Sequence, residues 1–194
     1  MAEYRLKTPI SEDDARRLRA GDVIYITGVV VTARDQAHRR ALELARRGEK
    51  LPVDLEGGVI YHCGPIVRQE QGEWRIYGFG PTTSARMEQL EPEFIERFGV
   101  RVIVGKGGMF ERTTVALKRF GAVYAQHPGG ASALAVSSVR RVLGVYWLDL
   151  GMPEAMWVVE VEDFGPLTVT VDSTGRNLYL EVLESARMRA AKTR

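Results

Sequence analysis

The sequence has one cysteine, Cys63, among its 194 residues. One thiol cannot form an intramolecular disulfide, and it cannot by itself hold a zinc ion or an iron–sulfur cluster. Long apolar runs are also missing, because charged residues or glycines interrupt every stretch before the roughly 20 residues that a membrane helix needs. Residues 1–7 lack the apolar core of a signal peptide. These absences predict a cytoplasmic protein with no membrane span and no metal centre of its own.

Charge of the two signs is nearly balanced, with 27 lysines and arginines against 25 aspartates and glutamates. Four of the basic residues lie in the last ten positions, and the rest of the chain carries a net charge of −2. A basic surface of the kind that binds nucleic acid is therefore not expected. The positive excess belongs to a basic C-terminal tail, which we place at residues 185–194.

What the chain does have is an ordinary globular composition, with 45% hydrophobic and 27% charged residues. Apolar runs rich in β-branched residues alternate with amphipathic helical patterns, which predicts an α/β fold of mixed sheets with flanking helices. No repeat or linker divides the chain, so we expect one domain over residues 1–184. The expected strands are 22–32 (which Gly28 can divide into two), 58–63, 66–68, 74–79, 100–104, 122–125, 156–161 and 167–171. The expected helices are 11–18, 35–47, 87–98, 110–120 and 131–142.

Polar groups gather at four points where a predicted strand ends, which is where α/β proteins tend to bind ligands. The first point is segment 32–38, between a strand and a helix. Asp35 can cap that helix, and Arg34 beside the helix N-terminus can bind a carboxylate or a phosphate. The alternative is that Arg34 and His38 are solvated or paired with acids on the helix face.

The second point is segment 80–86, where the hydroxyls of Thr82, Thr83 and Ser84 precede a helix and Arg86 follows. Hydroxyls, backbone N–H groups and a guanidinium at a helix start form an anion site. Helix capping alone would also select threonine and serine at these positions.

Lys106 marks the third point, with glycines on both sides in segment 105–108. The glycines leave the lysine open to an approaching anion. The segment matches neither GxxxxGK[ST] nor GxGxxG, so a nucleotide-binding domain is not expected. A solvated surface lysine is the alternative.

The fourth point is segment 127–133, whose paired glycines allow close backbone approach before a helix. No two of the three histidines have the spacing of metal ligands, so no metal site is expected. His62 and Cys63 lie in a predicted buried strand, which favours a packed histidine beside an inert thiol over a catalytic dyad.

Arg34, Arg86 and Lys106, together with the hydroxyl cluster, predict a site for a small polycarboxylate or phosphorylated substrate. The sequence shows no evident base, nucleophile or metal site beside them. A part of the catalytic machinery is therefore missing from this chain.

Several segments, in one order, carry a family resemblance from about Gly21 to about Asp172. They are Thr27-Gly28 with 32–38, His62-Cys63-Gly64-Pro65, 80–87, Gly105-Lys106-Gly107, Gly129-Gly130-Ala131, and 150–157 with 159–164. On these motifs the chain resembles the β subunit of class I fumarate hydratases and of the related L-tartrate dehydratase.

The resemblance implies a swivelling β/β/α domain that closes over an active site and supplies substrate-binding groups. In this family a separate α subunit, or an N-terminal domain, holds a [4Fe–4S] cluster through three cysteines, and a subunit with one cysteine fits that division. The implied enzyme is a hetero-oligomer that reversibly hydrates fumarate to (S)-malate and is active only with its α subunit.

By motif match, the resemblance assigns substrate binding to Arg34, Thr82, Thr83, Arg86 and Lys106, and catalysis to Thr82 and Lys106. Loss of a proton next to a carboxylate builds negative charge on that carboxylate, which nearby cations stabilise. The resemblance also implies that Thr82 takes part near the proton transfer, together with an acid of the α subunit.

Two alternatives stay open. The same residues suit an L-tartrate dehydratase β subunit, because nothing in them distinguishes a 2,3-dihydroxy substrate. A catalytically silent anion-binding domain of the same fold is the other, although retention of all three cations argues against it. His38 is assigned to local structure, and Glu154 and Asp163 to the fold or a partner interface.

Overall fold

The computed structural model describes residues 1–192. The strands are β1 (Glu3–Lys7), β2 (Val23–Thr32), β3 (Val59–Tyr61), β4 (Ile66–Glu70), β5 (Glu73–Gly78), β6 (Val102–Gly105), β7 (Val123–Gln126), β8 (Val139–Tyr146) and β9 (Met156–Val171). The α-helices are α1 (Glu12–Arg17), α2 (Asp35–Arg46), α3 (Glu91–Phe98), α4 (Glu111–Phe120), α5 (Ser132–Ser137) and α6 (Leu178–Lys192). Two short 3₁₀ turns are η1 (Ser84–Met87) and η2 (Leu148–Leu150).

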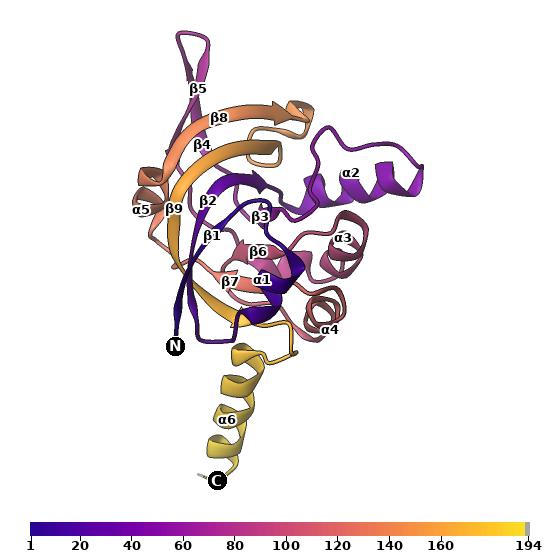
Figure 1. Cartoon of the computed structure of the whole chain (residues 1–194), viewed down its shortest axis with the longest axis vertical. Helices are drawn as coiled ribbons and strands as arrows, with labels where there is room; N and C mark the ends of the chain where they lie inside the picture. Colours follow the sequence, from indigo (N-terminus) through magenta and orange to yellow (C-terminus); the bar gives the residue numbers. More distant parts are fainter. Residues whose placement is uncertain (193–194) are drawn as a thin grey trace.

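The main sheet closes on itself. Four strands of this sheet, β2, β3, β6 and β7, are parallel to one another. Strand β9 pairs antiparallel with both β7 and β2. These pairings complete a ring of five strands, with β1 added beside β2 and β8 beside β9. Figure 1 shows β9 as a long arc that bends around one side of the ring, with β8 following it on the outside. The expected mixed sheets with flanking helices are confirmed.

Alternate residues of the ring strands face two different cores. In β3, Val59 and Tyr61 belong to the apolar cluster inside the ring, whereas Ile60 belongs to the cluster beneath the helices. The alternation repeats in β6 and β7, because successive strand side chains point to opposite faces. Since both faces are covered, these strands read in the sequence as continuous apolar runs rather than as alternating patterns.

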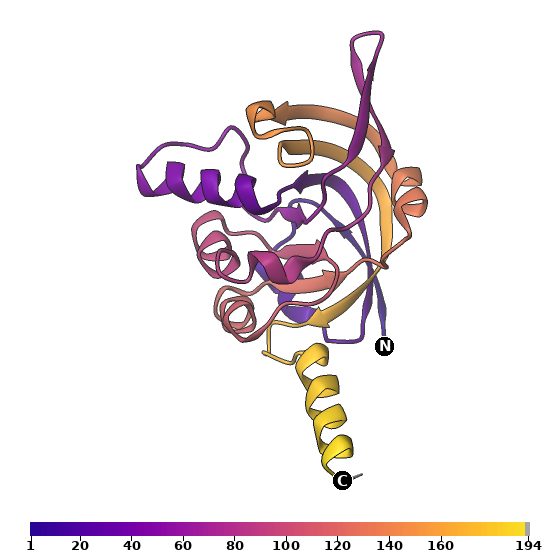
Figure 2. The same ribbon diagram turned by 180° about the vertical axis from the view of Figure 1, so that it is seen from behind.

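Helices α2, α3 and α4 cover one outer side of the ring, which Figures 1 and 2 show from opposite directions. Each contributes apolar residues from one face to the outer cluster, such as Leu42, Phe94 and Leu117. Helix α1 lies at the ring itself, where Ala15 and Leu18 join the inner cluster. Ser11 caps α1 by accepting a hydrogen bond from the Asp14 N–H, as the sequence pattern predicts.

The helix expected at 131–142 is wrong in its second half. Only α5 is helical, and the residues that follow form β8, which pairs with the first half of β9. Val139, Val142 and Val145 are β-branched and pack against the inner core, so the tertiary pairing overrides the local helical pattern.

Other elements also differ from the expectation: β1 and α6 were not expected, and the helix expected at 87–98 is α3, which begins at Glu91. The two strands expected at 156–161 and 167–171 are one continuous strand, β9. Gly28 does not divide β2; it lies within the strand, where a Cβ would come 2.3 Å from the Thr8 hydroxyl. That hydroxyl accepts a hydrogen bond from the Val29 N–H, so the glycine makes room for a neighbouring segment.

Two elements extend from the body, the β4–β5 hairpin and α6 (Figures 1 and 2). The hairpin pairs the two strands expected at 66–68 and 74–79 in antiparallel orientation. Helix α6 continues past residue 184, where the domain was predicted to end, so most of the predicted tail is helical. The division of the chain at residue 184 stays a prediction. Residues 193–194 of the tail lie outside the described residues.

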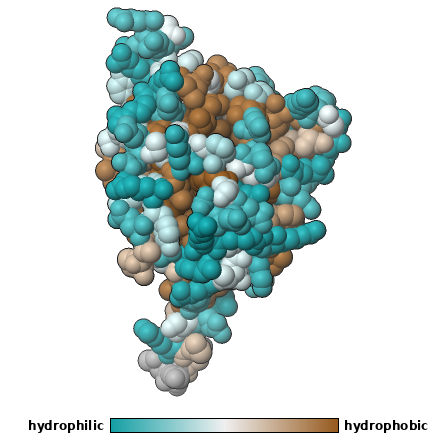
Figure 3. Space-filling model, in the orientation of Figure 1, coloured by the Kyte–Doolittle hydropathy of each residue, from teal (hydrophilic) through white to brown (hydrophobic). Residues whose placement is uncertain are grey.

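Across the described residues, no helix is both long enough and apolar enough to cross a lipid bilayer. Figure 3 shows mixed hydrophilic and hydrophobic surface, with brown concentrated on the upper half of the face in view. The large exposed apolar side chains are dispersed over several elements, including Ile66, Leu134, Leu143 and Val182.

Candidate functional site

The predicted binding segments converge because of the strand directions. The carboxyl ends of β2, β3, β6 and β7 lie at one edge of the ring, since these strands are parallel. Segment 32–38 follows β2, His62 follows β3, and Lys106 follows β6. Loops after parallel strands that meet at one edge form the usual ligand position of α/β proteins.

Segment 80–86 joins this edge through backbone hydrogen bonds. The Thr82 N–H donates to the His62 carbonyl at 2.6 Å, and the Lys106 N–H donates to the Thr82 carbonyl at 3.3 Å. The Ser84 N–H donates to the Lys106 carbonyl at 2.8 Å, and Thr83 pairs with Lys106 as a parallel β-bridge. Thr82, Thr83 and Lys106 therefore lie side by side.

Arg34 occupies the N-cap position of α2, in extended conformation. Its Nε lies 3.2 Å from a Glu154 carboxylate oxygen, and the other oxygen accepts the Gln36 N–H at 2.9 Å. Glu154 thus does at the α2 N-terminus what was expected of Asp35, which makes no capping hydrogen bond. Gly64 lies against Arg34, since a Cβ there would come 2.6 Å from its Nη1.

Arg86 reaches the same place from η1. Its Nη2 lies 2.8 Å from an Asp35 carboxylate oxygen, and its side chain is 49% exposed. Asp35 directly follows Arg34 in the chain, so the ion pair between Arg86 and Asp35 places Arg86 close to Arg34.

The cations outnumber the acids at this edge. Arg34 and Arg86 each have a carboxylate partner, whereas the Lys106 ammonium has neither an ion pair nor a hydrogen-bond partner within residues 1–192. Lys106 is only partly exposed, and the loop at Gly129 passes beside it, where a Cβ would come 3.8 Å from its Cδ. An unpaired ammonium between hydroxyls and arginines favours an anionic ligand.

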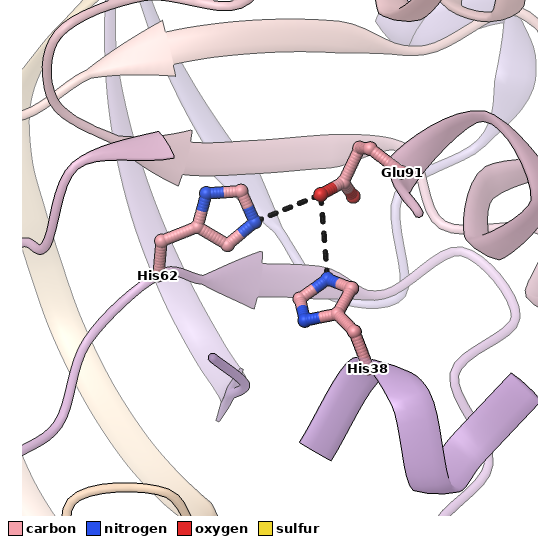
Figure 4. A group of neighbouring side chains, drawn as sticks. All are labelled: His38, His62 and Glu91. Atoms are coloured by element: carbon pink, nitrogen blue, oxygen red, sulfur yellow. Dashed lines mark hydrogen bonds and ion pairs between the residues drawn. The ribbon is translucent and has the colours of Figure 1, made fainter. Parts of the chain in front are cut away.

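A buried cluster that the sequence did not predict lies beneath the predicted site residues. His38, His62 and Glu91 come from α2, the end of β3 and the start of α3, and all three side chains are 0% exposed (Figure 4). Glu91 Oε2 lies 2.9 Å from His62 Nε2 and 3.3 Å from His38 Nε2. His62 Nδ1 lies 2.9 Å from Ser84 Oγ, and His38 Nδ1 lies 2.9 Å from the Arg34 carbonyl oxygen.

Protonation differs between the two histidines. Burial by itself lowers the pKa of His38, but the Glu91 carboxylate outweighs burial and leaves that pKa raised. Burial dominates at His62 and lowers its pKa in spite of Glu91. Burial disfavours the Glu91 carboxylate, but its two histidine partners together hold the Glu91 pKa well below its usual range. The Glu91 carboxylate thus acts in opposite balance with burial at the two histidines, raising the pKa of His38 and failing to prevent the fall in the pKa of His62.

By ligand type the same three side chains could hold a metal ion, since one donor atom from each lies within 4.8 Å of the others. The sequence spacing of the histidines gave no indication that His38 and His62 lie close together. Their separation of 24 positions shows no ligand spacing, and only the packing of α2 against the end of β3 brings them together. Glu91 was not singled out, because a glutamate before a proline in a helical segment carries no local sign of burial.

The remaining thiol and imidazole serve the core. Cys63 is fully buried, and burial raises the pKa of its thiol far above the usual range, which keeps it protonated. His127 stacks on Phe164 with ring centroids 5.6 Å apart, and burial lowers its pKa. The interpretation of Cys63 as an inert packed thiol agrees with this position.

A closed ring whose parallel strands end in cations, hydroxyls and glycines is typical of an α/β domain that binds an anion. The chain matches the family described as Fumarase C-terminus over residues 1–182, and it belongs to that family.

Relatives within the family carry two kinds of name. The L(+)-tartrate dehydratase subunit beta of Escherichia coli K12 is 48% identical over 176 residues, which are 91% of this chain and 86% of the relative. A putative L(+)-tartrate dehydratase subunit beta of Methanocaldococcus jannaschii is 47% identical over 89% of each chain. A putative fumarate hydratase class I of Geobacillus stearothermophilus is 41% identical over 93% of this chain but only 34% of that longer protein.

Proposed function

We propose that this chain is the β subunit of a two-subunit iron–sulfur hydro-lyase that reversibly hydrates fumarate to (S)-malate. The observation that carries the proposal is the convergence of Arg34, Arg86 and Lys106 at one strand edge, with the Lys106 ammonium unpaired among the described residues. A dicarboxylate supplies the negative charge that this edge lacks. Membership of the Fumarase C-terminus family supports the reaction class.

The proposal places the [4Fe–4S] cluster on an α subunit. This chain does not fit the cluster itself, because its single cysteine is fully buried in the inner core. When bound by the partner, such a cluster supplies the Lewis acid that makes hydroxide a tolerable leaving group.

This chain's residues bind and orient the substrate in the proposal. The Lys106 ammonium and the Arg86 guanidinium hold one carboxylate each or share one, and Arg34 uses the donors that Glu154 leaves free. Removal of the proton next to a carboxylate places charge on its oxygens, and the same cations stabilise that charge. Fixed bonds to both carboxylates also align the substrate with the partner's groups.

Thr82 is proposed as the residue of this chain that takes part near the transferred proton, and Thr83 as a substrate contact. Thr82 is partly buried, and its backbone bonds to both His62 and Lys106 fix its position at the strand edge. A hydroxyl acts as a proton acceptor only where nearby positive charge stabilises its anion, so Lys106 and Thr82 act together.

We further propose that the domain swivels as one body against the α subunit. The closed ring and its two cores join all strands of the main sheet, so the binding edge moves with the whole domain. Small-angle scattering of the assembled enzyme should show compaction on addition of a dicarboxylate inhibitor, and an unchanged profile would contradict the swivel.

A second candidate function is dehydration of L-tartrate. It is favoured by the names of relatives that match nearly their whole length at 47–48% identity. The same cations would bind its two carboxylates.

The test is co-purification of the tagged chain from its own host without oxygen. An iron-rich partner with several cysteines and fumarate hydration in the complex are expected. Turnover of L-tartrate alone would move the assignment to the second candidate. A chain recovered alone, without iron, and inactive with a reconstituted α subunit would overturn the hydro-lyase proposal in favour of a silent anion-binding domain.

A further inference from the structure

We propose that His38, His62 and Glu91 form a buried network of hydrogen bonds and an ion pair. Through this network Glu91 connects Arg34 to segment 80–86 and positions the backbone of the anion-binding site. The functional meaning of this coupling rests on the proposed function, whereas the network itself does not. Glu91 and the two histidines are positioning residues, since they lie beneath the site and act through Arg34 and Ser84.

The hydrogen-bond partners define the protons on His38. Its Nδ1 lies 2.9 Å from the Arg34 carbonyl oxygen, which only accepts, so Nδ1 carries a proton. Its Nε2 lies 3.3 Å from the Glu91 carboxylate, which also only accepts. This Nε2 lies at ion-pair distance from the carboxylate rather than in a hydrogen bond to it, so the proposal assigns His38 as an imidazolium on charge attraction and on the proton at Nδ1.

The protons on His62 follow from the other end of the network. The Tyr124 hydroxyl lies 3.0 Å from Ser84 Oγ and donates to it. His62 Nε2 lies 2.9 Å from the Glu91 carboxylate, which only accepts, so Nε2 carries a proton; the proposal leaves Nδ1 unprotonated, to accept from Ser84 Oγ at 2.9 Å. His62 is neutral, with its proton on Nε2, from which it donates to Glu91 at 2.9 Å.

This arrangement balances charge within a fully buried space. The Glu91 carboxylate is neutralised by the His38 imidazolium, and His62 adds a hydrogen bond without a second positive charge. Asp35, the other carboxylate near both histidines, favours their protonation and is itself paired with Arg86. A buried carboxylate without a partner is strongly unfavourable, so losing either member of the pair disturbs the other.

The network ends on the two backbone segments that carry the cations. The Arg34 carbonyl accepts both the backbone N–H and the Nδ1–H of His38, each at 2.9 Å. Ser84 lies within segment 82–86, and its Oγ fits only because residue 105 is glycine, where a Cβ would come 1.9 Å away. In this way the Glu91 carboxylate sets the position of Arg34 relative to segment 80–86.

A metal ion held by the same three residues would have a different signature. The ion would replace the proton on each Nε2 and leave His62 protonated at Nδ1 instead. The tautomer of His62 and the metal content of the protein therefore separate the two arrangements.

The first test is nitrogen-15 NMR of the imidazoles in the full chain, from pH 5 to pH 9. The three histidines should show three different states at pH 7. We expect His38 to be an imidazolium and His62 to be the neutral Nε2–H tautomer. His127 donates from Nδ1 to the Pro128 carbonyl, so it should be the neutral Nδ1–H tautomer. His127→Gln assigns its signal. A neutral His38 at pH 7, an Nδ1–H tautomer at His62, or one equivalent of a divalent metal by mass spectrometry would overturn the network. None of these readouts depends on enzymatic activity.

The second test compares two buried glutamates in the assembled enzyme. Glu91→Gln removes the charge of the network, whereas Glu88→Gln removes a buried carboxylate that bonds the Phe110 N–H and Thr113 at the start of α4. Glu91→Gln should raise KM for the dicarboxylate at least tenfold with a smaller loss of kcat. Glu88→Gln should lower the thermal midpoint without that rise in KM.

Equal effects of the two substitutions on KM, or no effect of Glu91→Gln in a folded complex, would overturn the coupling to the site. If Glu91→Gln does not fold, His62→Asn replaces it; the amide can reach either Ser84 or Glu91 but not both, so KM should again rise. An inactive wild-type complex in which His38 is an imidazolium would refute the proposed function alone.

Discussion

Two sets of cations in this protein, one on the outer strand β8 and one at the strand-end site, have different surroundings. On the outer strand β8, Arg140 and Arg141 lie opposite Glu162 and Glu160 of β9, at 2.5 Å and 2.6 Å, with side chains 54% and 69% exposed. At the strand-end site, Arg34 is only 21% exposed. Lys106 is unpaired there across residues 1–192.

The comparison distinguishes charged side chains that only pair with each other on the surface from charged side chains that can bind a ligand. An exposed pair across two strands satisfies both partners and contributes little, because water screens it. A partly buried cation held by backbone hydrogen bonds, without a complete set of partners, keeps its donors for a ligand. Position in the fold, rather than the number of basic residues, therefore marks the site.

Removal of a strand-end cation should have the largest effect. Arg86→Ala or Lys106→Met in the assembled enzyme should lower kcat/KM at least ~100-fold, because a charged contact is lost from the transition state. Arg141→Ala is the matched control and should stay within about twofold, since its charge is paired on β8. Steady-state kinetics checks this, and equal losses for the two groups would break the comparison.

Thr82 sharpens the comparison from binding to chemistry. Thr82→Val should lower kcat ~100-fold with little change in KM, the scale of a lost proton-transfer contribution. Thr82→Ser should recover most of the activity because it restores the hydroxyl. A Thr82→Val variant with a raised KM and wild-type kcat would show that the hydroxyl only binds substrate.

The contrast between buried and exposed charge also applies to carboxylates. It predicts that removal of a buried, hydrogen-bonded carboxylate lowers the free energy of unfolding more than removal of an exposed one. Asp172 is buried and accepts hydrogen bonds from the Ala20, Thr174 and Arg176 N–H groups and the Thr174 hydroxyl. Asp172→Ala should therefore lower the free energy of unfolding by about 3 kcal/mol, as expected when bonds to a charged acceptor are lost. Urea unfolding of the full chain at pH 7 measures this loss.

The contribution of Asp172 should also depend on pH. Burial opposes its charge, but the hydrogen bonds prevail and hold its pKa below the ordinary 3.8. Its stabilisation is thus complete above pH 3.8 and is lost as the pH falls through the folded-state pKa. The gap between wild type and Asp172→Ala should narrow below pH 3.8, and a constant gap would show that the charge contributes nothing.

The smallest effect is expected where both partners are exposed. Glu160→Ala removes the partner of Arg141 and should change the free energy of unfolding by less than about 0.5 kcal/mol. A loss as large as that of Asp172→Ala would mean that the β8–β9 pairs are structural after all.

Much of the strand-end site could be predicted because its signals are local. A cation or hydroxyl just after an apolar run is visible in the sequence, and parallel strands bring such positions together. Arg34, segment 80–86 and Lys106 were found in this way, and the structure places them at one edge. Their individual roles stay predictions that the variants above test.

Several features that the sequence analysis missed depend on distant partners. β8 resembles the end of a helix until it pairs with β9, and the role of Glu154 at the α2 N-terminus joins positions 118 residues apart. Asp35, the local choice for that cap, pairs with Arg86 instead. Local propensity cannot report a contact whose partner is elsewhere in the chain.

Side-chain periodicity and turn chemistry act over a few residues, so the apolar strand runs, the amphipathic helices and the loops that carry cations can be predicted from the sequence. The closure of the ring by β9 against β2, and the meeting of Glu91 with two fully buried histidines, depend on tertiary packing. Strand pairing and the neutralisation of a buried charge both require groups far apart in the chain to arrive at one place.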